Sequence, residues 1–250
     1  MSEYPLPVKS LWQPPLGWLG VTLLAGLCLW FFYQQAPPTH QRSLRTARWL
    51  VIPYLGLLTG GISPRLMGLT GINWFASFGF GLVLIGSVLV TLVLVRSVMA
   101  ISGSPTTLVA SSFASLPANR LQPMPLLKET ERQQRYTRAI ANAVFNLGVE
   151  EFHLAFVRSA IWELLWTTAS PTLQAGYWAA WAALAITIPE ALSHQSTLTQ
   201  RLSKGALLVA TTVLFIFTRN FWLSWLLHLL GWLVLAPSTV QRHPTNRPVR

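Results

Sequence analysis

The sequence of 250 residues has few charged side chains, no aspartate and one cysteine. Charged residues make up 10% of the chain, whereas an ordinary soluble domain has about 25%. This shortage excludes a soluble globular domain and a disordered chain, because too few charges are present to cover a surface in water. The one cysteine, Cys28, cannot form an internal disulfide and says nothing about the redox compartment.

Apolar and basic residues are abundant instead. Hydrophobic residues make up 52% of the chain, and 18 Lys and Arg against 7 Glu give a formal net charge of +11. In so apolar a chain, the basic residues indicate loops that face an anionic membrane surface rather than a nucleic acid. The 12 Trp residues are expected mostly in aromatic belts at the membrane surfaces.

Seven apolar stretches predict helices, since a membrane helix needs about 20 mostly apolar residues. The expected helices cover residues 15–33, 48–63, 73–99, 138–166, 175–194, 204–218 and 221–237. We expect the first to be a retained helix, because aromatic rather than small residues follow its apolar core. The predicted fold class is therefore all-α: a polytopic integral membrane helical bundle of about seven transmembrane helices.

The chain is expected to divide into an amino-terminal region, a core and a tail. Residues 1–137 hold three helices, a loop and a short surface helix from Met124, residues 138–237 hold four helices, and residues 238–250 form a basic tail. Lys and Arg gather in alternate connections, at Arg42, Arg45 and Arg48, at Arg96, Arg120, Lys128, Arg132, Arg135 and Arg138, at Arg201 and Lys204, and at Arg242, Arg247 and Arg250. This alternation predicts a cytoplasmic carboxyl terminus, in a bacterial plasma membrane or an internal photosynthetic membrane.

Ionisable side chains inside the expected spans are the first candidates for a functional site, because such groups are costly in a membrane. The fourth span carries Glu150 and Glu151, which point about 100° apart around a helix. His153 is expected to be a local partner of Glu150, and Arg158 lies two turns after Glu151 on one stripe. The structural alternative is a buried ion pair of either glutamate with Arg158 or His153.

Two more candidates stand on later spans: His194 closes the fifth and His228 lies near the middle of the seventh. The adjacent Glu150 and Glu151 followed by these two histidines resemble the CPBP family of membrane proteins. That family includes the CAAX prenyl protease type and bacterial abortive-infection relatives. Its pattern is Glu-Glu-x-x-x-Arg, then Phe-x-x-x-His, then His-x-x-x-Asn, and the resemblance covers roughly residues 138–237.

The chain departs from this family pattern at three positions. Ala155 stands where the pattern has Arg, Glu190 where it has Phe, and Trp232 where it has Asn. The glutamate pair and both histidines are kept, so the resemblance is stronger for the family than for its activity.

The resemblance implies an intramembrane endopeptidase of the CAAX protease type. Glu150, next to Glu151, would act with His194 to activate a water that attacks a peptide carbonyl, and His228 would stabilise the oxyanion. Glu150, His194 and His228 would also suit Zn²⁺ as three ligands with an open fourth position, although a metal-free Glu–His base fits as well. The expected partners are membrane lipids and a peptide or membrane-protein substrate, with no nucleic acid.

Two other functions remain open at this point. The altered motif positions also fit a catalytically silent member that serves as a scaffold or assembly subunit of a larger membrane complex. A pigment or haem binder would use His228 or His194 as an axial ligand. In the structural alternative, His194, Glu163 and Glu190 are residues at the membrane interface.

Overall fold

The computed structural model describes residues 15–33, 38–101, 129–168, 174–193 and 198–235. These residues form seven helices and no strand, so the expected all-α class is confirmed for the part described. The helices are α1 (Pro15–Tyr33), α2 (Pro38–Leu58), α3 (Trp74–Ile101), α5 (Glu129–Thr168), α6 (Ala175–Ser193), α7 (Leu198–Thr218) and α8 (Phe221–Leu235).

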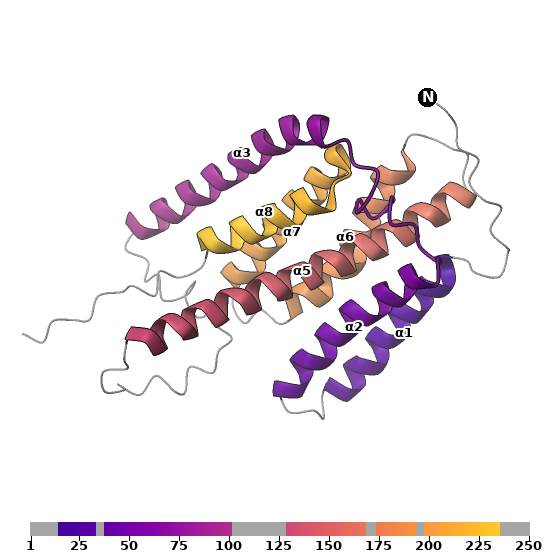
Figure 1. The fold of residues 1–250 in the computed structure, drawn as a ribbon, viewed down its shortest axis with the longest axis horizontal. Coiled ribbons are helices and arrows are strands. Elements are labelled where there is room, and N and C mark those ends of the chain that lie inside the picture. Colours follow the sequence, from indigo (N-terminus) through magenta and orange to yellow (C-terminus); the bar gives the residue numbers. More distant parts are fainter. Residues whose placement is uncertain (1–14, 34–37, 102–128, 169–173, 194–197, 236–250) are drawn as a thin grey trace, which may run out of the picture.

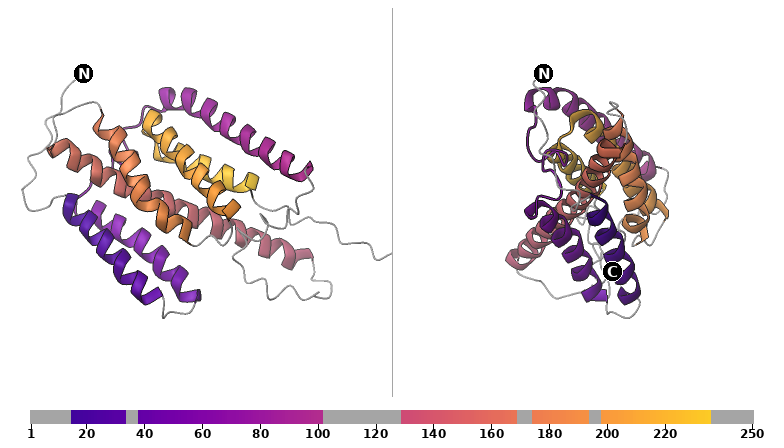
Figure 2. Two further views of the ribbon diagram at one scale, coloured as in Figure 1. Left: turned by 180° about the vertical axis from the view of Figure 1, so that it is seen from behind. Right: turned by 90° about the vertical axis from the view of Figure 1, so that its right-hand side faces the viewer.

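The long helix α5 runs through the whole bundle and organises it (Figure 1). The hairpin of α1 and α2 packs on α5, and α6 and α8 also pack on α5. Helix α7 lies between α6 and α8, and α3 covers α7 and α8 at the edge of the molecule (Figures 1 and 2). Helices α1, α2, α6 and α8 therefore pack on α5, and α7 reaches it through side chains such as Lys204 and Phe215, while α3 packs on α7 and α8.

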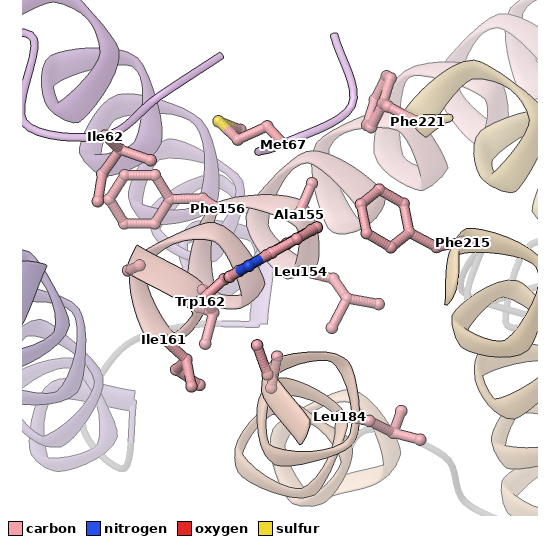
Figure 3. Packing of buried hydrophobic residues seen from close by; sticks show 14 of the residues in the cluster. Ile62, Met67, Leu154, Ala155, Phe156, Ile161, Trp162, Leu184, Phe215 and Phe221 are labelled. Carbon is pink, nitrogen blue, oxygen red and sulfur yellow. The ribbon is translucent and has the colours of Figure 1, made fainter. Parts of the chain in front are cut away.

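The hydrophobic core lies around the second half of α5. Figure 3 shows Phe156 of α5 beside Ile62, while Phe215 of α7 and Phe221 of α8 approach from the other side. A second, smaller cluster holds α3 against α7 and α8. Hydrogen bonds also join α3 to these helices: Ser77 Oγ donates to the carbonyl oxygen of Thr218 at 3.1 Å, and the Arg96 guanidinium donates to the carbonyl oxygen of Val234.

The connection between α2 and α3 folds back into the bundle instead of extending away from it. Its side chains Ile62 and Met67 are buried, and Ser159 on α5 donates a hydrogen bond to the carbonyl of Ser63 at 3.3 Å. The carbonyl of Gly68 accepts a hydrogen bond from the backbone N–H of Phe221 at 3.1 Å. This connection thereby ties the first half of the chain to the turn between α7 and α8.

Two helices begin earlier than the apolar pattern predicted. Helix α2 begins at Pro38, not at residue 48, and α7 begins at Leu198, not at residue 204. Proline suits the first turn of a helix, and polar residues can extend a helix beyond its apolar segment. As a result, Arg45 lies on a helix instead of in a loop, and Arg48 and Lys204, expected at the first residues of helices, lie inside them.

Helix α5 is also longer than expected. It runs without a break from Glu129 to Thr168, and no separate surface helix precedes the span within the described residues. Residue 138, the expected start of the core region, lies inside it. The expected surface-helix start at Met124, the loop 102–128, the carboxyl-terminal tail and His194 all lie outside the described residues.

Among the described residues, two helices can cross a membrane by length and composition: Trp74–Val98 in α3 and Gln200–Thr218 in α7. Two shorter apolar helices, Pro15–Leu29 and Phe221–Leu235, accompany them. Helix α5 carries ionisable side chains along its middle, and α2 has a basic first half, which is why these long helices are not apolar enough. The seven spans expected from the sequence are therefore not confirmed.

Gly68 provides a test of the buried connection. It has φ +76°, and an added Cβ would lie 2.7 Å from the carbonyl oxygen of Arg219 and 2.9 Å from the backbone nitrogen of Phe221. Gly60 has a similar φ of +66° with nothing within 4 Å of the added atom. Any residue with a Cβ in this left-handed conformation lowers the free energy of unfolding by about 1–2 kcal/mol. Because nothing surrounds the added atom at Gly60, Gly60→Ala measures this backbone cost alone.

We expect Gly68→Ala to lower the thermal unfolding midpoint of the detergent-solubilised protein more than Gly60→Ala does, because it adds a backbone clash. Circular dichroism measures both midpoints. Equal shifts in the two variants would show that the connection is not packed against the α7–α8 turn.

Candidate functional site

Two of the residues singled out in the sequence meet inside the bundle. Nδ1 of His228 on α8 lies 3.5 Å from Oε2 of Glu151 on α5, and their side chains are 1% and 0% exposed. The two residues are far apart in the sequence, and the packing of α5 against α8 brings them together. Nδ1 thus lies beside a carboxylate without a hydrogen bond to it, and Nε2 is the other ring nitrogen that can exchange a proton.

Glu150 has a different partner from its neighbour, because adjacent residues point about 100° apart around a helix. Its carboxylate oxygens lie 2.9 and 3.0 Å from Nζ of Lys204 on α7. The side chains of Lys204 and Glu150 are 13% and 11% exposed, so the ion pair is largely withdrawn from solvent. Sequence reasoning missed this pair, because it counted Lys204 with the preceding loop, at the first residue of the expected helix.

Arg158 is completely buried two turns beyond Glu151 on α5. Its guanidinium carbon lies 3.1 Å from the ring centroid of Phe215 on α7, in a cation–π arrangement. It interacts electrostatically with Glu151, but no ion pair joins the two side chains. Arg158 therefore lies on one stripe with Glu151 as expected, while the ion pair of the structural alternative is not formed.

Several buried polar atoms around these residues have no hydrogen-bond partner within the described protein. They are both carboxylate oxygens of Glu151, Nδ1 of His228, all three guanidinium nitrogens of Arg158 and Nδ2 of Asn220. A buried polar group without a partner costs about 1–3 kcal/mol, and more when it is charged. The site is therefore polar, enclosed and under-satisfied by the protein alone.

His153 belongs to a second polar cluster, on the other side of α5. Its ring stacks on Trp49 of α2 with centroids 5.6 Å apart, whereas Glu150, its expected partner, pairs with Lys204. Arg48 of α2 forms an ion pair with Glu190 of α6, and the indole N–H of Trp49 donates to the same carboxylate at 3.1 Å. Glu190, expected at the interface, thus helps to dock the amino-terminal hairpin.

The donor set was tested for the expected Zn²⁺. No group of three His, Cys, Asp or Glu side chains that could hold a metal ion occurs in residues 15–33, 38–101, 129–168, 174–193 and 198–235. The ammonium of Lys204 already neutralises Glu150, which leaves Glu151 and His228 as two potential ligands, where zinc needs at least three. The described residues do not fit a zinc site, and the predicted ligand His194 lies outside them.

The missed ion pairs carried a signal in the sequence. Lys204, Thr211 and Phe215 are spaced by seven and four residues, so a helix extended backwards from the apolar run would place all three on one face. Asn220 was also missed, although it immediately precedes an apolar helix as a capping residue. Its side-chain oxygen accepts hydrogen bonds from the backbone N–H groups of Trp222 and Leu223, at 3.0 and 3.3 Å.

Comparison of the chain with protein-family models, curated proteins and solved structures gives no match. The function must therefore be argued from the geometry of Glu151, His228 and the groups around them.

The Glu150–Lys204 pair leads to a stability prediction. Lys204→Met leaves a buried carboxylate without its counter-charge, and breaking a buried pair in this way costs about 3–5 kcal/mol. The double variant Lys204→Met with Glu150→Gln removes both charges, so we expect it to recover most of that loss. Thermal unfolding in detergent measures the effect, with Arg65→Met as the control for loss of an exposed cation. If the double variant loses as much stability as Lys204→Met and Glu150→Gln lose together, the two side chains do not form a direct pair.

Proposed function

We propose that this protein is a polytopic membrane protein with a CPBP-type peptidase site, in which Glu151 and His228 activate water to hydrolyse a peptide bond. The observation that carries the proposal is the 3.5 Å approach of the His228 ring to the Glu151 carboxylate in a buried setting. A histidine oriented by a carboxylate is a recurring general base in hydrolases.

Membrane embedding is supported by the outer surface of α3. Only 11% of the candidate span Trp74–Val98 is buried, and Phe75 and Val83 on this helix are 94% and 71% exposed. Such a surface suits lipid tails and would be costly in water. We place the site in a bacterial plasma membrane or an internal photosynthetic membrane, with lipids around it and the carboxyl terminus in the cytoplasm.

The geometry favours Glu151 over Glu150 in the reaction. The resemblance to the CPBP family implies Glu150 as the base, but Lys204 holds that carboxylate in an ion pair. In the proposed step, Nε2 of His228 takes a proton from water while the water oxygen bonds to the peptide carbonyl carbon. Glu151 stabilises the resulting imidazolium, which then gives its proton to the departing amine. His194 stays a proposed helper outside the described residues.

The peptidase proposal predicts cleavage that depends on both side chains. In membranes of a bacterial host, we expect wild-type protein to generate new protein amino termini, detected by mass spectrometry. Glu151→Gln and His228→Ala should each reduce them at least about 100-fold, as loss of a general base does.

Matched controls are available in the second polar cluster. Glu190→Gln removes a paired carboxylate and His153→Ala removes a buried imidazole, both outside the proposed dyad. These variants should keep cleavage when expressed at equal levels. The same new termini in wild type, Glu151→Gln and His228→Ala would refute the peptidase proposal.

A catalytically silent scaffold is the second candidate, and the Glu150–Lys204 ion pair favours it. This pair neutralises the carboxylate that the family pattern would use, and Ala155 and Trp232 replace two further motif residues. The Glu150–Lys204 pair would then serve to hold α5 and α7 together as a platform for another membrane protein.

The scaffold candidate predicts one stoichiometric membrane-protein partner. The affinity-tagged wild type and the double variant Glu151→Gln with His228→Ala should retain the partner equally in mild detergent. The reason is that the dyad is not needed for binding. Quantitative mass spectrometry measures the ratio. A solitary protein that cleaves substrate would rule out this candidate.

A further inference from the structure

A row of buried polar side chains follows one face of α8. Asn220, Ser224 and His228 are spaced by four residues, so they lie one above another along the helix. Their side chains are 0%, 0% and 1% exposed. A polar row of this kind is unusual in an otherwise apolar helix, and it requires a polar structure opposite to it.

Helices α5 and α7 supply the opposite walls. The hydroxyl of Ser224 lies 3.4 Å from the carbonyl oxygen of Thr211 on α7, in hydrogen-bonding geometry. Glu151 and Arg158 on α5 are both fully buried, and Ala155 between them has only a methyl group. We call Glu151, Arg158, Thr211, Asn220, Ser224 and His228 the polar column.

The polar column has unsatisfied groups of opposite character at its two ends. Both oxygens of Glu151 and Nδ1 of His228 lack hydrogen-bond partners in the described protein at one end. At the other end, the same holds for Nδ2 of Asn220 and the three nitrogens of Arg158. Acceptors and donors that are buried but too far apart to bond directly are the usual setting for ordered internal water, which makes two to four hydrogen bonds.

The two ends of the polar column differ in their surroundings. Beyond His228, α8 continues with Gly231, where an added Cβ would lie 2.5 Å from Cδ1 of Leu207 on α7. Leu207 and Leu227 are buried in the same apolar cluster. An apolar contact therefore follows His228 along α8, while the Asn220 end of the polar column lies at the α7–α8 turn next to the exposed Arg219.

We propose that the polar column binds a chain of ordered water molecules leading from the α7–α8 turn to the Glu151–His228 pair. Asn220 and His228 are eight residues apart, which is about 12 Å along a helix. About four waters at hydrogen-bond spacing span that distance. The donors of Arg158 and Asn220 and the acceptors of Glu151 fix the two ends of the chain.

A role of this water in hydrolysis rests on the proposed peptidase function, whereas hydration of the polar column does not. In a peptidase site enclosed by lipid, the reacting water must be delivered through the protein. The polar column would supply it from the membrane face at the α7–α8 turn and exclude it from the apolar core around Phe156.

Cysteine reactivity tests the hydration directly. In a Cys28→Ser background, Ser224→Cys places a thiol in the polar column, and Ala183→Cys places one in the apolar packing of α6, where Ala183 is also fully buried. The small neutral reagent methyl methanethiosulfonate reaches both through lipid, but it reacts with thiolate, which forms only where water is present. We expect modification of Ser224→Cys to be at least about tenfold faster.

A second pair of cysteine variants repeats the comparison at other positions, in case one variant of the first pair does not fold. Thr211→Cys lies in the polar column and Ala180→Cys in the apolar packing, and both parent side chains are buried. Retained thermal unfolding midpoints verify the fold of each variant. If neither polar-column cysteine reacts faster than its apolar control, the column is dry and the proposal is overturned.

The supply of water to the reaction needs its own variant. Ser224→Leu fills the polar column but leaves Glu151 and His228 intact, so we expect at least a tenfold loss of new amino termini. Ser87→Leu, on the exposed face of α3, should cleave as wild type does. Full cleavage by Ser224→Leu would refute the supply role even if labelling shows water. If the wild-type protein produces no new amino termini at all, the peptidase proposal is refuted. The cysteine labelling still decides whether the polar column holds water.

Discussion

The buried charges of α5 determine how this bundle is assembled. A charged group taken out of water costs several kcal/mol unless a partner compensates for it, and an apolar bundle offers few partners. Lys204 on α7 compensates Glu150, and His228 on α8 faces Glu151. Because consecutive residues point in different directions, one Glu-Glu sequence fixes the position of two further helices around α5.

The same requirement shapes the amino-terminal half. Arg48 on α2 and Glu190 on α6 form an ion pair across the bundle, and a Cβ on Gly26 of α1 would lie 2.5 Å from the Arg48 guanidinium. The hairpin of α1 and α2 therefore docks through the Arg48–Glu190 ion pair. Glycine at position 26 leaves the space that the Arg48 guanidinium occupies. Polar contacts select the neighbours of α5, and the apolar cluster around Phe156 packs between them.

Much of the fold was predictable from apolar runs, because each of the seven helices coincides with one. The starts of α2 and α7 were not, since nothing apolar marks the polar turns before Arg48 and Lys204. In the site, Glu151 and His228 were each identified from the sequence, because burying an ionisable side chain in a hydrophobic segment is energetically costly. Their mutual contact, and the pairing of Glu150 with Lys204, depend on the rotation of helices about their axes, which a single sequence with soft helix ends does not determine.

The link between α7 and α8 has a consequence for how the chain is made. Only residues 219 and 220 separate the two helices, and Arg219 adopts a left-handed conformation with φ 49°. So short a link leaves no slack for the two helices to separate, so α7 and α8 must fold as one antiparallel pair. In the proposed membrane setting, the two segments would leave the insertion machinery together, with the imidazole of His228 already shielded by α7.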